Sequence, residues 1–265
     1  MAFEQRRQPR RGLIERERLD DGVAVVERHH RRGGRQVAEP HRLLAALARA
    51  ARGADYSLTR AHAAGILGRF PVAAALPALE AAARDTSAQV RAAVMSALGT
   101  LGGDRALAIG HDAWRSDSSY QVRAGALLVL VRLRGPDARE AVRRGLETPS
   151  YRDAIQNVAI AAIVQRPDSE LVWALARQAG AQPLPTIALA ALTARGDSTA
   201  RRALLESLDD ARGWVRAWSL QAVEGQLEPE DALAVLRDAV GGLRRPEARA
   251  AVQEAIGRLE RRARG

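Results

Sequence analysis

The sequence contains no cysteine, which excludes disulfide bonds, thiolate metal ligands and a cysteine nucleophile. Aromatic residues make up only 3% of the 265 residues, and the alternation of β-branched and aromatic side chains that marks strands is missing. No run of 18 apolar residues occurs, so the sequence predicts no transmembrane helix. Residues 1–18 are rich in Arg and lack the hydrophobic run of a secretory signal. The default expectation is therefore a cytoplasmic protein.

Lysine is absent as well, and all 41 basic residues are Arg, against 31 acidic residues. The resulting net charge of +10 suggests nucleic-acid binding. The excess lies at the ends of the chain, however, because residues 41–240 carry 24 Arg and 21 acidic residues. An interleaved and nearly neutral body is typical of a solvated surface. Nucleic acid is therefore possible as a partner but disfavoured.

Catalytic and cofactor-binding motifs are also missing from the sequence. The five histidines include no pair spaced by four residues, and no Gly-rich phosphate-binding pattern occurs. Acidic residues are plentiful, but no spacing singles out a pair for acid–base chemistry. The sequence predicts no enzyme activity, no metal site and no cofactor.

A short pattern recurs along the chain: an Asp, followed six residues later by an Arg with Val just before it. Copies occupy residues 85–91, 117–123 and 210–216, and a looser copy runs from Asp55 to Arg60. The Arg residues of successive copies are 31, 32 and 93 residues apart. A period of about 31 residues is typical of a stacked-repeat protein.

Between these copies the apolar residues follow helical spacing, and Gly, Pro and Asp mark the breaks. Residues 40–262 are predicted to form an all-α solenoid of about seven antiparallel helix pairs. Helices this short are marginal alone in water, so each pair must be covered by its neighbour. Residues 1–39 lack the periodicity and are predicted to be an Arg-rich, disordered arm. After a first pair ending near Gly68, helices are expected at about 72–84, 87–101, 105–115, 119–133, 138–147, 150–165, 168–179, 184–195, 198–208, 212–225, 229–240 and 246–262.

The repeated Asp is expected in the turn inside each pair, and the repeated Arg in the first turn of the second helix. There the Asp can accept backbone N–H groups, and the planar Arg fork can bridge it to the Asp of an adjacent repeat. This predicts a structural ladder, with ligand binding by the arginines as the alternative. The predicted ladder residues are Asp85, Arg91, Asp117, Arg123, Asp210 and Arg216. The pattern is missing between about residues 148 and 186, where the stack is expected to bend or loosen.

An apolar first helix, a turn Asp, and Val-Arg-Ala opening an Ala- and Leu-rich second helix resemble the HEAT repeat, in the variant common in bacterial proteins. The resemblance covers about 220 residues and implies an α-solenoid with an Asp–Arg ladder. It implies little about function, because such repeats serve scaffolds, adaptors, a few lyases and DNA-repair proteins.

A narrower resemblance concerns residues 117–124 and 148–156, which are similar to segments in the C-terminal HEAT-like region of bacterial M1-family metallo-aminopeptidases. It implies that the chain is the non-catalytic tail of such an enzyme, detached from a catalytic domain that would be its partner. The catalytic motif of that family, His-Glu-x-x-His, is absent. The leading hypothesis is a non-catalytic scaffold that binds a protein or domain. The alternative is a HEAT-like protein that binds nucleic acid with Arg and Trp in its concave groove.

Five side chains are candidates for contact with a partner. Tyr120 and Tyr151 occupy equivalent positions, three residues before the ladder position, and Arg152 follows the second of them. Trp214 and Trp218 are spaced to share one face of a helix. Tyr, Trp and Arg are enriched at binding hot spots. The alternative is structural: the two indoles would fill gaps in an Ala-rich core, and the tyrosine rings would pack against the neighbouring turn with their hydroxyls in water.

Overall fold

The computed structural model describes residues 38–264, and within them it contains fourteen α-helices, one 3-10 helix and no strand. The helices are α2 (Ala38–Gly53), α3 (Ser57–Leu67), α4 (Val72–Ala82), α5 (Ala88–Leu101), α6 (Asp104–Ser116), α7 (Tyr120–Arg132), α8 (Ala138–Glu147), η1 (Tyr151–Asp153), α9 (Ala154–Gln165), α10 (Ser169–Arg177), α11 (Leu184–Ala194), α12 (Ser198–Leu208), α13 (Gly213–Gln226), α14 (Pro229–Val240) and α15 (Pro246–Arg264). None of these helices is long and apolar enough to cross a membrane.

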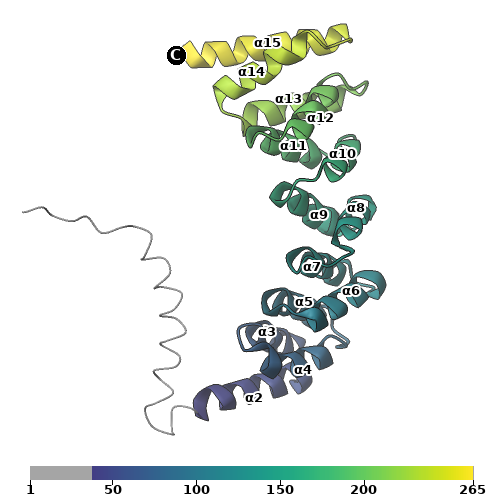
Figure 1. Ribbon diagram of the computed structural model, residues 1–265, viewed down its shortest axis with the longest axis vertical. Coiled ribbons are helices and arrows are strands. Elements are labelled where there is room, and N and C mark those ends of the chain that lie inside the picture. The colour runs from purple at the N-terminus through teal and green to yellow at the C-terminus, as the bar shows by residue number, and fades with distance from the viewer. Residues whose placement is uncertain (1–37, 265) are drawn as a thin grey trace, which may run out of the picture.

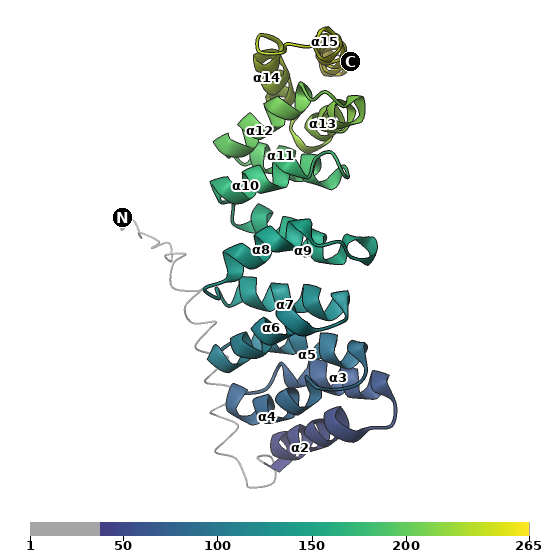
Figure 2. The ribbon, with the colours of Figure 1, turned by 90° about the vertical axis from the view of Figure 1, so that its right-hand side faces the viewer.

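The helices form seven antiparallel pairs stacked into a curved solenoid, from α2 and α3 at one end to α14 and α15 at the other (Figure 1). Even-numbered labels mark the first helix of each pair, and odd-numbered labels mark the second. Figure 1 shows the second helices, such as α5, α7 and α9, along the inner side of the curve. The view turned by 90° places the first helices in front (Figure 2). The predicted all-α solenoid of about seven HEAT-like pairs is confirmed.

One apolar core runs the length of the stack and is built mainly from Ala, Leu and Val. In α5 the side chains of Val90, Val94 and Leu98 recur every four residues and are fully buried. Small residues let the second helices approach closely: a Cβ atom on Gly68 would lie 2.8 Å from the Cα atom of Ala97. Each second helix is therefore covered by the second helices of its neighbours.

The largest departure from the predicted helices lies at the start of α9, the second helix of the fourth pair. A helix was expected from residue 150, but α9 begins at Ala154, after the 3-10 turn η1. Arg152 and Asp153 both have positive φ angles, 52° and 53°, which interrupt the helix. The Ser150 hydroxyl accepts a hydrogen bond from the backbone N–H of Ile155 at 3.0 Å and so caps α9.

The stack is also looser near this point than among the first four pairs. The helices α9 and α11 share fewer close contacts than α5 and α7 or α7 and α9. Pro183 and Pro185 lie at the start of α11, in the region where the sequence predicted an irregular stack. At the other end, α2 begins at Ala38, two residues before the predicted start of the solenoid. The rest of the predicted arm, residues 1–37, lies outside the described residues.

Candidate protein-interaction edge

Because the pairs stack in the same orientation, the loops inside the pairs and the N-terminal ends of the second helices follow one long edge of the solenoid. We call this the turn edge. The loops that join successive pairs follow the opposite edge. Every candidate residue singled out in the sequence lies at or near the turn edge, apart from Trp218, which lies one helical turn into α13.

Two bidentate ion pairs lie at the turn edge. Arg60 donates from Nε and Nη2 to Asp85 at 2.7 and 3.0 Å. Arg91 donates in the same way to Asp117 at 2.7 and 2.9 Å. The Nη1 group of Arg91 also donates to the backbone oxygen of Asp85 at 2.8 Å. Each Arg thus connects its own turn to the Asp of the next repeat, as in the ladder arrangement.

The carboxylates of these pairs are also bonded within their own turns. Asp85 accepts a backbone hydrogen bond from Ser87, and Asp117 accepts one from Ser119, each at 2.8 Å. Hydrogen bonding from Arg60 lowers the pKa of Asp85 against the opposing effect of burial. Burial acts to raise the pKa of Asp117, but the bonds from Arg91 and Ser119 outweigh it and leave the pKa below its ordinary value.

The ladder does not continue through Arg123 as expected. Its Nε group donates to the backbone oxygen of Trp114 at 3.2 Å, and its guanidinium carbon lies 5.2 Å from the centre of the Trp114 ring. The physical reason is the next turn, Thr148–Ser150, which supplies no carboxylate. Arg123 therefore packs against its own repeat through a cation–π contact.

Asp210 and Arg216 also differ from the predicted ladder. Ile187, the fourth residue of α11, occupies the Arg position of the preceding repeat. Asp210 pairs instead with Arg212 in its own turn, at 2.8 and 2.9 Å. The Nη1 group of Arg216 donates to the backbone oxygens of Asp210 and Ala211. Arg216 forms no ion pair within the described residues, because Leu243 stands at the acid position of the next repeat.

The exposed aromatic side chains of the described residues all lie at the turn edge. They are Tyr56, Tyr120, Tyr151 and Trp214, with exposed fractions between 42% and 77%. The first three are all the tyrosines of the chain. Each is at or just before the first turn of a second helix. A chain with so few aromatic residues therefore exposes four of them along one edge.

Three of the predicted contact residues come together between the third and fourth pairs. The rings of Tyr120 and Tyr151 stack with their centres 6.3 Å apart and an angle of 29° between their planes. The guanidinium carbon of Arg152 lies 5.3 Å from the centre of the Tyr151 ring. This cluster of two phenol rings and a guanidinium group offers apolar surface, hydrogen-bonding groups and a positive charge in one place.

Trp214 and Trp218 lie two pairs further along and have different environments. Trp214 is exposed, and its indole N–H donates to the backbone oxygen of Gly180 at 3.3 Å. That bond holds the ring against the loop of the preceding pair. Trp218 is half-buried, so the pair of tryptophans does not form one exposed surface.

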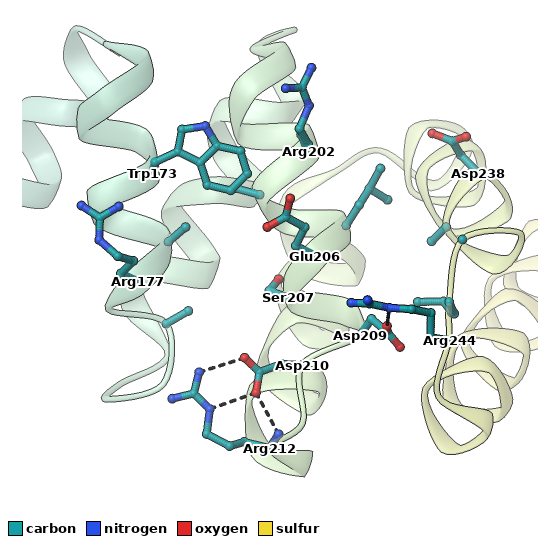
Figure 3. A pocket seen from close by; sticks show the side chains of 17 residues that line it. Trp173, Arg177, Arg202, Glu206, Ser207, Asp209, Asp210, Arg212, Asp238 and Arg244 are labelled. Atoms are coloured by element: carbon teal, nitrogen blue, oxygen red, sulfur yellow. Dashed lines mark hydrogen bonds and ion pairs between the residues drawn. The ribbon is translucent and has the colours of Figure 1, made fainter.

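A second feature, a groove between the first helices α10, α12 and α14, was missed in the sequence (Figure 3). It encloses about 1070 Å³ and is lined by Trp173, Arg177, Arg202 and Glu206, among others. Trp173 is half-buried and lies at the groove. The residues that line the groove come from three separate repeats and share no motif, so no sequence signal identified the groove. Within residues 38–264, no group of three His, Cys, Asp or Glu side chains could hold a metal ion.

A comparison with known protein families agrees with the repeat architecture over part of the chain. A family model of HEAT repeats matches residues 43–109, which span α2 to the first half of α6. No curated protein matches the chain. Among solved structures, the chain is similar to the complex of CpcE and CpcF of phycocyanin lyase from Nostoc sp. PCC7120, with a TM-score of 0.45 and 19% identity over 80% of this chain and 93% of that chain. These comparisons give no support to the resemblance to M1-family aminopeptidases.

Proposed function

We propose that this chain is a non-catalytic HEAT-repeat scaffold that binds a protein partner along its turn edge. The observation that carries the proposal is the placement of all three tyrosines and Trp214, exposed, along that edge. Tyr and Trp combine large apolar area with a polar group and lose little conformational freedom on binding. Tyr120, Tyr151 and Arg152 form the densest part of this surface, and Trp214 extends it.

The M1-family resemblance concerns the same place, because residues 117–124 and 148–156 contain Tyr120 and Tyr151. A catalytic domain of that kind is therefore one candidate partner. The proposal does not depend on it, since the exposed aromatic edge could bind any partner with a complementary apolar surface.

The alternative, nucleic-acid binding in the concave groove, is less well supported by the surface of the second helices. The exposed positions of α5 are Gln89, Ser96 and Thr100, and those of α9 are Asn157, Ala161 and Gln165. A groove that follows a phosphate backbone needs a row of Lys or Arg side chains. The uncharged side chains at these positions do not provide one.

The test compares partner capture by three versions of the full chain. One version carries Tyr120→Ala, Tyr151→Ala and Trp214→Ala, and the matched control carries Ile66→Ala and Val72→Ala. Ile66 and Val72 are exposed apolar residues at the opposite edge. Each protein is used to isolate cross-linked partners from the source cells, and the same partner is then titrated as a purified protein. We expect the edge variant to bind it about tenfold more weakly or worse, and the control to bind it normally.

Equal affinity of the edge variant and the control for that purified partner would refute the proposal. Binding of a labelled DNA duplex is measured in parallel at low and high salt. A steep loss of DNA affinity with salt would favour the alternative function, and a flat, weak signal at low salt would remove it.

A further inference from the structure

Arg216 is held in the same conformation as the two arginines that form bidentate ion pairs. Its Nη1 group donates to the backbone oxygens of Asp210 and Ala211 at 2.7 and 3.1 Å. The corresponding bonds are 2.7 and 3.1 Å long for Arg60, and 2.8 and 3.1 Å long for Arg91. One side of the Arg216 guanidinium is therefore fixed to its own turn, as in the ladder.

The other side of the Arg216 guanidinium differs from the ladder. In Arg60 and Arg91 the Nε and Nη2 groups hold the Asp of the next repeat. In the seventh pair the position six residues before Arg249 is Leu243, whose side chain is buried. The described residues thus provide no carboxylate for Nε and Nη2 of Arg216. These groups reach the surface, because no buried side-chain nitrogen in the described part of the chain lacks a hydrogen-bond partner.

We propose that Arg216 is a receptor for a carboxylate side chain of an acidic segment in the protein partner. This inference rests on the proposed function and adds the chemistry of one contact. The Nε and Nη2 groups form a planar fork that matches a carboxylate, as the pairs of Arg60 and Arg91 illustrate within the same molecule. Two backbone bonds already hold the fork in place, so little conformational freedom is lost when it binds.

The surroundings of Arg216 favour an acidic peptide over a phosphate chain. The loop before α15 adds Arg244, whose side chain is 91% exposed, and Arg245. The carboxylates of Asp209 and Asp210 lie in the same turn that holds Arg216, and they are bound by Arg244 and Arg212. A single carboxylate can enter beside these acids, whereas a phosphate backbone would bring several charges close to them. The exposed ring of Trp214, in the same first turn of α13, offers adjacent apolar contact.

Arg123 provides a matched control inside the same protein. It occupies the same position in its repeat, and the next repeat also lacks the acid. Its guanidinium is turned onto Trp114, however, and is not fixed by its own turn as that of Arg216 is. Arg123 should therefore bind a carboxylate more weakly than Arg216.

The experiment follows the Nε–H signals of the arginines by NMR in the full chain. The probes are a blocked hexapeptide of alternating Glu and Ala, the same peptide with Gln in place of Glu, and a single-stranded DNA oligonucleotide. The signals of Arg60 and Arg91 report the carboxylate-bound state in the same spectrum. We expect the Glu peptide to move the Arg216 signal toward theirs and the Gln peptide to leave it in place. The variants R216Q and R216K should each bind the Glu peptide about tenfold more weakly, and R123Q should bind it normally.

Unchanged Arg60 and Arg91 signals show that each variant is folded. The proposal is overturned if the Glu and Gln peptides move the Arg216 signal equally, if neither moves it at millimolar concentration, or if R216K binds as the unmodified chain does. It is also overturned if the oligonucleotide competes with the Glu peptide at lower concentration, because the site would then prefer phosphate. None of these results depends on the Tyr120 and Tyr151 surface, so failure here is distinct from failure of the proposed function.

Discussion

Arg91 and Asp117, 26 residues apart in the sequence, are joined by two parallel hydrogen bonds while their side chains are only 15% and 10% exposed. The two residues belong to consecutive repeats. Their bond therefore fixes how the third pair sits on the second. A pair this well shielded is costly to break from one side, because the remaining charge loses its partner without regaining full hydration.

The first prediction is that Asp117→Asn destabilises the chain by about 2 kcal/mol. The substitution keeps the shape of the side chain but replaces the carboxylate with an amide. The single amide oxygen can accept only one of the two hydrogen bonds that Arg91 donates. We expect the midpoint of thermal unfolding, measured by circular dichroism, to fall by about 5 °C. Glu80→Gln is the control, because Glu80 pairs with Arg105 at a far more exposed site. That substitution should lower the stability of the chain only slightly. Equal effects of the two substitutions would contradict the buried role of Asp117.

The second prediction concerns acid. The pKa values of Asp85 and Asp117 are lower in the folded chain than in the unfolded chain. The stabilisation from both carboxylates is therefore fully present above the unfolded pKa of about 4, and it is lost as the pH falls through the folded values. We expect the unfolding midpoint of the unmodified chain to drop more steeply below about pH 4 than that of the Asp85→Asn, Asp117→Asn double variant.

The unfolding midpoints of the unmodified chain and the double variant should converge toward the lowest pH, because the protonated carboxyls no longer bind the arginines as anions. If the difference between the two midpoints stayed constant from pH 7 to pH 2.5, the ionisation of these carboxylates would contribute nothing to stability. Glu140→Gln serves as the comparison. Hydrogen bonds from Arg143 and Arg144 lower the pKa of Glu140 to about 2, yet all three side chains are largely exposed, so solvent screens the gain.

The fold was predictable from the sequence because its signals are local and repeated. Gly, Pro and Asp mark the helix ends, apolar residues recur at helical spacing, and the Asp-to-Arg pattern returns in phase. The bond made by each repeated Arg was less predictable, since it depends on a residue one repeat ahead. Arg91 finds Asp117 there, whereas Arg123 finds the turn at 148–150 and Arg216 finds Leu243.

Other features of the candidate sites could not be predicted from a motif. The contact between Tyr120 and Tyr151 follows from their equivalent positions in adjacent repeats, but the turn that presents Tyr151 depends on positive φ angles at Arg152 and Asp153. Neither residue type signals such angles, although Asp adopts them more readily than most. The groove at Trp173 depends on side chains of three first helices, which only the stacked structure brings together.

The third prediction tests the close approach of α3 and α5. A methyl group in Gly68→Ala would lie 2.8 Å from a backbone carbon of Ala97, and backbone cannot move aside cheaply. We expect a loss of about 2 kcal/mol in the free energy of unfolding, measured by urea titration. Gly65→Ala is the matched control one turn earlier, where nothing lies within 4 Å of the new methyl group. That substitution should stabilise the chain by about 0.5 to 1 kcal/mol through helix propensity. A Gly68→Ala variant as stable as Gly65→Ala would rule out the tight contact.

The fourth prediction concerns the looser packing between α9 and α11. Arg195, just after α11, donates from Nη1 to the backbone oxygen of Val164 near the end of α9. This bond is one of few polar links between the fourth and fifth pairs, so its removal should let them separate more often. In Arg195→Ala we expect the backbone amides of α9 and α10 to exchange with deuterium several-fold faster, while those of α5 and α7 stay as protected as before.

Mass spectrometry of peptic fragments after short exchange times measures the difference. Arg132→Ala is the control, because Arg132 is also an exposed Arg at the end of a second helix but forms no hydrogen bond through its side chain within the described residues. If Arg195→Ala raises exchange evenly along all seven pairs, the stack opens as one unit and the α9–α11 boundary is no weaker than the rest. Faster exchange confined to α9 and α10 would mean that the solenoid opens first at the boundary between the fourth and fifth pairs, one repeat beyond the joint that Tyr120 and Tyr151 span.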